Sequence, residues 1–193
     1  DIGSYGGEIA TPHLDALAAN GVRFTQFYST PRCSPSRAAL LTGLYPHQAG
    51  MGHLDNIIRE GSSGTTGRLN DRSVTIAEVL RQAGYFTGMA GKWHLGQQNG
   101  SPPWQRGFDR VLNIRAGGIF FPNQNFPGGD ELTKRGQEPL YLDGRPIAHD
   151  SPELRQNWYT TFLWTDFALK FVDEAKKAGI PMRDAPEPSR EDL

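Results

Sequence analysis

A single thiol and an arginine lie close together in the stretch CSPSRAALLTG, from Cys33 to Gly43. Pro35 can occupy the first turn of a helix, and the apolar residues after Arg37 continue it. Cys33 is therefore predicted at or just before a helix N-terminus, where backbone N–H groups and the helix dipole stabilise a thiolate or a bound anion. Arg37, on the next turn, can reach the same point. The alternative is a small buried thiol beside a solvated arginine.

A cation and a proton-transfer group lie close together in a second stretch, GYFTGMAGKWHLG, residues 84–96. A strand predicted over Tyr85–Ala90 places the following residues at its carboxyl end, where α/β sheets usually bind ligands. If the chain stays extended, Lys92 and His94 point to the same side, because side chains of a strand alternate. The alternative is an edge loop with a surface lysine and a packed histidine.

Weaker candidates lie near these two stretches. His47 and His53 flank a glycine-rich loop and could contact a substrate, or they could serve the structure, since neither has a partner at metal-ligand spacing. Asn99-Gly100-Ser101 has the form of a glycosylation acceptor.

Two helices with recognisable ends precede the second stretch. Thr11-Pro12 begins the first, which ends at Gly21, and a strand is predicted next over Arg23–Tyr28. The second begins with a capping box at Thr75–Glu78 and ends at Gly84. Its predicted buried stripe consists of Ile76, Val79, Leu80 and Ala83.

A third helix is predicted over Trp158–Ala178, with apolar residues at intervals of four. Those residues are Leu163, Phe167, Phe171 and Ala175. Between Gly96 and Pro152 the chain lacks a sustained period, which predicts loops and a short strand at Leu140–Leu142 before a turn at Asp143-Gly144. The tail after residue 181 is predicted to fray. Helices alternate with strands, which is typical of a layered α/β domain.

Composition limits the class of protein. The chain has 193 residues, which is enough for one domain. Its formal net charge is -1, so the overall charge gives no reason to expect binding to nucleic acid. No apolar run is long enough to predict a membrane span. One cysteine cannot form an internal disulfide, so the sequence leaves the redox compartment undetermined. The chain starts with Asp1 rather than Met and is interpreted as a piece of a longer protein.

The two stretches together resemble the paired signatures of the cysteine-type sulfatase family. CSPSRAALLTG is similar to the signature that a maturation enzyme reads when it oxidises the cysteine to formylglycine. GYFTGMAGKWHLG is similar to the second signature, Gly-Tyr-x-Thr followed by Gly-Lys-Trp-His. The opening DIGSYGGEIATPHLDALAANGVRFTQFYS, the link GRLNDRSVTIAEVLRQAGY and the later RGFDR and YLDGRPI also resemble the family, to about Gly179.

The resemblance implies hydrolysis of aryl or carbohydrate sulfate esters by a formylglycine diol derived from Cys33. The ester can be a small molecule or a glycan. It implies that Arg37 orients the diol, that Lys92 binds sulfate and supports the leaving group, and that His94 assists proton loss. It also implies a divalent cation, usually Ca2+, with the residue at position 33 among its ligands. The implied partners are the sulfate ester and the formylglycine-generating enzyme.

The implied fold is alkaline-phosphatase-like, with a central, largely parallel sheet between helices. Residues 1–193 are expected to form the N-terminal part of a sulfatase catalytic domain, without its first strand and its C-terminal portion. The family's Asp-Asp and Asp-Asn metal ligands are accordingly expected outside this chain, and their role is not transferred to Asp1. Arg32 is unusual before the modified cysteine, and the segment Pro181–Pro186 departs from the family pattern.

Two other functions stay open from the sequence. A phosphomonoester or phosphodiester hydrolase of the same superfamily could use the same diol, because sulfate and phosphate differ chiefly in charge. A catalytically inactive fragment could result from missing metal ligands. For a bacterial parent, a periplasmic or secreted location is favoured.

Overall fold

The computed structural model describes residues 1–123 and 138–180. The chain forms two compact units, Asp1–Thr30 and Pro31–Leu193. The tail that is predicted to fray and the departure at Pro181–Pro186 lie outside the described residues.

The first unit contains one short 3-10 turn, Gly3–Tyr5, and helix α1, Pro12–Ala19. Pro12 begins the helix as predicted, since the first turn needs no N–H at that position. The Thr11 hydroxyl donates to Oδ1 of Asp15 and accepts from the N–H of Gly3, both at 2.9 Å. Thr11 therefore links the turn to the helix instead of capping it, and no side-chain cap bond is made at this end.

The strand predicted over Arg23–Tyr28 is wrong. The structure has no strand there, and Phe27 and Tyr28 are 75% and 86% exposed. A strand needs hydrogen bonds to a neighbour, and among the described residues none pairs with this segment. Composition alone does not provide that partner.

The second unit is built on a four-stranded mixed sheet in the order β1-β2-β3-β4. Strands β1 (Gly88–Lys92) and β2 (Arg110–Ile114) are parallel, with Lys92 opposite Ile114. Strands β3 (Leu140–Leu142) and β4 (Arg145–Ile147) continue the sheet in antiparallel fashion. Strand β1 begins three residues later than predicted and includes Lys92. Strand β2 is a short strand within the region 96–152, for which loops with short strands are predicted.

The hairpin between β3 and β4 confirms the predicted turn. Asp143 and Gly144 both have positive φ, 50° and 88°, as a two-residue turn of the type favoured by strand twist requires. The Asp143 carboxylate also accepts from the N–H of Val111 at 2.8 Å, which fixes the hairpin to β2.

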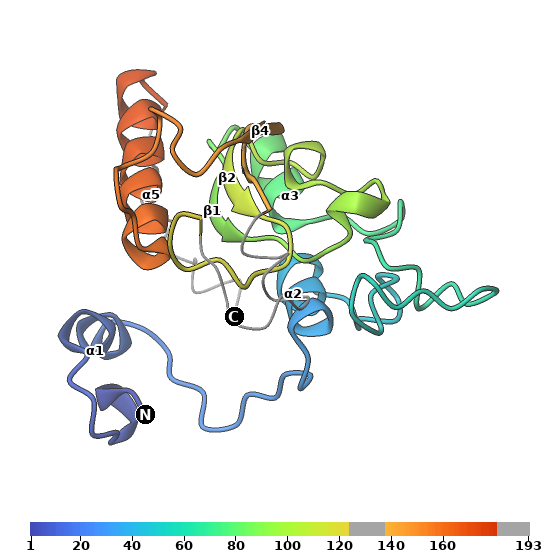
Figure 1. The fold of residues 1–193 in the computed structure, drawn as a ribbon. Coiled ribbons are helices and arrows are strands. Elements are labelled where there is room, and N and C mark those ends of the chain that lie inside the picture. The colour runs from blue at the N-terminus through green and yellow to red at the C-terminus, as the bar shows by residue number, and fades with distance from the viewer. Residues whose placement is uncertain (124–137, 181–193) are drawn as a thin grey trace. The chain divides into compact units, whose positions relative to one another are not determined.

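Helix α5 (Thr160–Lys177) covers one face of this sheet (Figure 1). Its four predicted apolar positions are all buried, because residues at intervals of four form one stripe on a helix. The ring of Phe171 lies so close to Gly88 that an added Cβ there would be 3.2 Å from it. The shared core consists of Leu112, Ile114, Ile119, Leu140, Leu142, Ile147, Leu154, Trp158, Leu163, Phe167 and Phe171.

A second core lies on the opposite face of β1. Met89 packs against this second core, whereas its neighbour Ala90 packs against the first, as alternation in a strand requires. The buried residues of the second core are Ala38, Ala49, Met51, Leu69, Trp93 and Leu95. Ala38 belongs to helix α2 (Cys33–Thr42), so this core joins α2 to the chain that follows β1.

Helix α3 (Ile76–Gln82) begins with the predicted capping box. The Thr75 hydroxyl accepts from the N–H of Glu78, and the Glu78 carboxylate accepts from the N–H of Thr75. The predicted buried stripe is wrong, because Ile76 and Val79 are 53% and 55% exposed while Ala77 is buried. The helix turns its small residue inward, since the Cα of Glu78 and the backbone of Ala77 lie directly against Gly107.

The architecture confirms a layered α/β fold, in which helices and loops cover both faces of a sheet. The expected largely parallel sheet is mixed in the described residues, with one parallel pair and two antiparallel ones. Within the described residues, no helix is both long and apolar enough to cross a membrane.

Candidate active site

Cys33 is the first residue of α2, and its thiol is exposed. The preceding Arg32 is extended, and no side chain caps the helix. The N–H of Ser36 already bonds the Arg32 carbonyl, and Pro35 has no N–H. The predicted position at a helix N-terminus is therefore confirmed, and the sulfur lies at the positive end of the helix dipole.

Arg37 joins α2 to the second stretch. Its Nε donates a hydrogen bond to the carbonyl oxygen of Trp93 at 2.7 Å. Burial lowers the pKa of Arg37 below its ordinary value, and electrostatic attraction to Cys33 works in the opposite direction. The guanidinium thus lies near Cys33 and is half-buried, not freely solvated.

Trp93 anchors the junction on the other side. It is completely buried, its indole N–H donates to the Ser101 carbonyl at 2.6 Å, and its ring meets Phe108 edge to face. Ala38 from α2 packs in the same core. A rigid aromatic residue therefore fixes the backbone between Lys92 and His94 relative to the first turns of α2.

Lys92 ends strand β1, and its side chain extends over the segment that follows β2. A Cβ added at Gly117 would lie 3.8 Å from Nζ, which is ordinary contact distance. Because β1 and β2 are parallel, their carboxyl ends meet at the same edge of the sheet. This is the edge where ligands usually bind in α/β folds.

His94 does not follow the predicted extended path. Its φ is +56°, in the left-handed region, although its N–H still donates to the Arg115 carbonyl at 2.7 Å. The extended path on which the alternation argument for Lys92 and His94 depends is therefore not present, since the strand ends at Lys92. A histidine held in this conformation is strained, and such strain persists where surrounding contacts impose it.

Asp55 is a site residue that sequence reasoning missed. It is 3% exposed, and its Oδ1 lies 3.2 Å from Nε2 of His94. Burial alone would raise its pKa. Hydrogen bonds from His94 and Gln98, with smaller contributions from the charges of His94 and Arg115, bring the pKa of Asp55 below its ordinary value. No spacing in the sequence links residue 55 to residue 94, so only the fold pairs them.

The weaker candidates have local roles. The ring of His47 packs against Gly52, and Nδ1 of His53 accepts from the N–H of Leu54 at 2.8 Å. The amide of Asn99 donates to the carbonyls of Asp55 and Gly67, both at 2.8 Å. These contacts support the structural interpretation of the two histidines, and the Asn99 amide holds two backbone carbonyls.

The described residues do not by themselves form a metal site. No group of three or more His, Cys, Asp or Glu side chains comes together in residues 1–123 and 138–180. Cys33 is exposed and can contribute one ligand at most. A cation at this position would need its other ligands from elsewhere.

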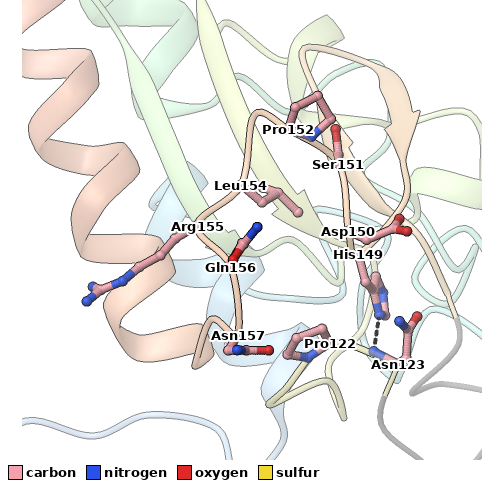
Figure 2. A pocket seen from close by; sticks show the side chains of 10 residues that line it. All are labelled: Pro122, Asn123, His149, Asp150, Ser151, Pro152, Leu154, Arg155, Gln156 and Asn157. Atoms are coloured by element: carbon pink, nitrogen blue, oxygen red, sulfur yellow. Dashed lines mark hydrogen bonds between the residues drawn. The ribbon is translucent and has the colours of Figure 1, made fainter.

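A pocket of about 590 Å³ is lined by residues outside the two stretches (Figure 2). Its lining comes from the segment 149–157 together with Pro122 and Asn123. Nδ1 of His149 accepts from the N–H of Asn123 at 2.8 Å. The Arg155 side chain extends away from the pocket, and its Nη1 lies 3.6 Å from the carboxylate of Asp166 in α5. No cation from the candidate site contributes to this pocket.

Comparison with known proteins agrees with the geometry. A family model described as Sulfatase matches residues 1–177. The Arylsulfatase of Klebsiella aerogenes is 46% identical over 132 residues, which is 67% of this chain and 28% of that protein. Arylsulfatase A of Homo sapiens is 48% identical over 168 residues, 82% of this chain and 31% of that protein. N-acetylgalactosamine-6-sulfatase of Canis lupus familiaris is 34% identical and covers 94% of this chain.

Solved structures are similar over most of the chain. The crystal structure of Ps i-CgsB matches with a TM-score of 0.72 and 30% identity, over 97% of this chain and 42% of that one. PsFucS1 sulfatase from Pseudoalteromonas sp. matches with a TM-score of 0.65 and 29% identity, over 94% and 39%. The layered fold is thus the alkaline-phosphatase-like fold of sulfatases, and the chain spans about a third of the length of these curated relatives. On this match of sequence, fold and signatures, the chain belongs to the sulfatase family.

Proposed function

We propose that the protein carrying this chain hydrolyses sulfate esters, with position 33 as the nucleophile after conversion of Cys33 to formylglycine. The observation that carries the proposal is the hydrogen bond from Nε of Arg37 to the Trp93 carbonyl. That bond joins the first signature to the second between Lys92 and His94. Because Cys33 begins the same helix as Arg37, this bond supports a shared site for the two signatures.

The exposed position of Cys33 suits maturation by a second enzyme. A formylglycine-generating enzyme must reach the cysteine and oxidise its β-carbon to an aldehyde, with molecular oxygen as the oxidant and with loss of the sulfur. Water then adds to the aldehyde to give a geminal diol. Arg32, next to the cysteine, is exposed as well and would lie in the segment that the maturation enzyme contacts.

The diol accounts for turnover in two steps. One hydroxyl oxygen forms a bond to sulfur while the bond between sulfur and the ester oxygen breaks, and the alcohol leaves with a proton. The second hydroxyl then loses its proton, the carbonyl re-forms, and the bond from carbon to the sulfate oxygen breaks. A serine or thiol nucleophile lacks that second hydroxyl, so its sulfate could leave only by attack of water.

The surrounding side chains have separate roles in this proposal. Arg37 balances the negative charge at position 33 and holds the diol in place. Lys92, at the carboxyl end of β1, binds sulfate oxygens and stabilises the leaving alkoxide. His94 takes up and returns a proton.

A divalent cation such as Ca2+ stays a prediction from the family resemblance. The described residues do not complete its site, so no step above depends on it. When bound, such a cation would polarise the sulfate ester.

Sulfated small molecules and glycans are the proposed substrates. The relatives are named as arylsulfatases and as an N-acetylgalactosamine-6-sulfatase. One similar structure is described as Ps i-CgsB in complex with k-i-k-neocarrahexaose. An aryl sulfate is therefore a suitable first probe, and sulfated oligosaccharides are the second.

The test compares an aryl sulfate with the matching aryl phosphate, using the full-length parent co-expressed with a formylglycine-generating enzyme. We expect turnover of the sulfate that is lost in Cys33→Ala and reduced by a chelator. Faster turnover of the phosphate would replace this proposal by a phosphohydrolase. No turnover of either ester by a protein whose position 33 is fully aldehyde would identify an inactive family member.

A further inference from the structure

A buried carboxylate, that of Asp55, pairs with the imidazole of His94. Oδ1 of Asp55 lies 3.2 Å from Nε2 of His94, and the two side chains are 4% and 10% exposed. A buried carboxylate is costly unless it is paired and hydrogen-bonded, so the pairing determines how both groups are placed.

The position of Asp55 is fixed by its backbone. The Asn99 amide donates to the Asp55 carbonyl and to the Gly67 carbonyl, both at 2.8 Å. Gly67 has φ +71°, and a Cβ there would lie 2.6 Å from the Asp55 carbonyl oxygen. These contacts hold the backbone of the loop between the two signatures in place at residue 55. Asp55 therefore does not adjust freely to His94.

The pairing decides which imidazole nitrogen carries the proton. A carboxylate only accepts hydrogen bonds, so Nε2 of His94 must carry a hydrogen and donate to Asp55. In the neutral ring, Nδ1 is then the nitrogen with a free lone pair. Nδ1 is buried and, within the described residues, has no hydrogen-bond partner. Within the described part of the chain, Nδ1 of His94 therefore makes no hydrogen bond that supports the fold.

We propose that Asp55 is a positioning residue, which holds His94 in the Nε2–H form and leaves Nδ1 to exchange the proton in sulfate-ester hydrolysis. The proposal rests on the proposed function. In the proton step, the O–H bond of a hydroxyl at position 33 breaks, its proton bonds to Nδ1, and the electron pair stays on oxygen. The carboxylate of Asp55 balances the imidazolium that forms, as a carboxylate behind a catalytic histidine does in other hydrolases.

The left-handed conformation of His94 fits this role. With φ +56° the residue leaves the path of β1 and turns toward Asp55, while its N–H keeps a 2.7 Å bond to the Arg115 carbonyl. Arg115 is itself paired with Glu138. The imidazole is therefore held by its backbone on one side and by the carboxylate on the other.

The kinetic test uses the matured full-length parent with Asp55→Asn, which keeps size and removes charge. We expect kcat for an aryl sulfate to fall about tenfold to hundredfold. KM should stay within about threefold, because Asp55 is only 3% exposed and acts through His94. Asp71→Asn is the matched control, since Asp71 is an exposed carboxylate paired with Arg68, and it should leave both constants unchanged.

A spectroscopic measurement distinguishes a positioning role of Asp55 from a role in stability alone. In the wild-type parent labelled with 15N-histidine, the His94 resonances, assigned with His94→Gln, should show a protonated Nε2 and a bare Nδ1 in the neutral form of the ring. In Asp55→Ala this preference should be lost. A wild-type Nδ1–H form, or an unchanged kcat in folded Asp55→Asn, would overturn the proposal.

The two readouts distinguish this proposal from the proposed function. If the matured parent cleaves no sulfate ester, the proposed function fails, whereas the histidine spectrum still reports the pairing of Asp55 with His94. If Asp55→Asn does not fold, the wild-type spectrum alone decides. An active parent whose His94 carries its proton on Nδ1 would refute the positioning role of Asp55, while the proposed sulfatase activity would stand.

Discussion

At the scale of single residues, the candidate site depends on a few hydrogen bonds that bring distant parts of the chain together. The bond from Arg37 to the Trp93 carbonyl joins the two signatures, and the pairing of Asp55 with His94 orients the imidazole. Both bonds are made by side chains that are at least half-buried, where they are less exposed to competition from water.

Arg37→Lys should therefore impair activity although it keeps the positive charge. Lysine carries all its donors on one nitrogen, so it cannot reproduce the planar guanidinium, whose Nε bonds the Trp93 carbonyl while its two Nη atoms keep their own donors. We expect kcat/KM for an aryl sulfate to fall about a hundredfold, measured on matured full-length parent. Arg72→Lys, at an exposed position, is the control and should keep wild-type activity. A fully active Arg37→Lys would show that the planar guanidinium is not needed.

At the scale of elements, α5 and the sheet form the more extensive of the two cores. Phe171 combines three contacts: it packs over Gly88, meets Phe167 edge to face at 5.9 Å, and lies beneath the guanidinium of Arg110 at 5.1 Å. The helix therefore supports β1 from behind, while α2 and the site lie against the other core.

Phe171→Ala should destabilise the folded parent by about 3–5 kcal/mol, because it removes buried ring surface and leaves a cavity between α5 and β1. Leu169→Ala, on the same helix but 61% exposed, should change stability by about 0.5 kcal/mol or less. Denaturant unfolding of both variants measures the difference. Equal effects of the two substitutions would contradict the assignment of the buried face.

Local rules predicted the elements whose determinants are close in sequence. The capping box at Thr75, the apolar stripe of α5 and the Asp143-Gly144 turn all depend on neighbours within one or two turns of chain. The failures share a different cause. The strand at Arg23–Tyr28 and the inward face of α3 are predicted from the local pattern of apolar residues, but pairing and burial depend on what the rest of the fold places opposite.

The residues of the candidate site also fall into those that the sequence predicts and those that it does not. Its signature residues could be identified from motif and resemblance, and the helix N-terminus at Cys33 from Pro35 and the following residues. Asp55 could not, because its partner lies far along the chain, and neither could the left-handed turn of His94, which follows a strand pattern until Lys92. Long-range contacts set both features.

At the scale of the whole molecule, many large apolar side chains are exposed in each unit. In residues 1–30, Val22, Phe27 and Tyr28 are 75–86% exposed, and in the second unit Leu40 and Tyr45 are 74% and 79% exposed. Among the described residues, β1 pairs only with β2, which leaves one edge of that strand unpaired. Exposed apolar surface and open strand edges both promote association.

The 193-residue chain expressed alone should therefore self-associate and bind a hydrophobic dye such as ANS. Size-exclusion chromatography and dye fluorescence measure this, with the full-length parent as the control. A monomer that unfolds in one cooperative thermal transition without binding dye would contradict the expectation.

The central claim is that position 33 acts as an aldehyde hydrate, with Arg37, Lys92 and His94 around it. The most direct measurement determines, by mass spectrometry, the fraction of parent molecules with an aldehyde at position 33 and compares it with the rate of aryl sulfate hydrolysis across preparations. The account predicts that rate rises in proportion to that fraction and vanishes for the pure thiol. Full activity in a preparation whose Cys33 is entirely unoxidised would contradict it.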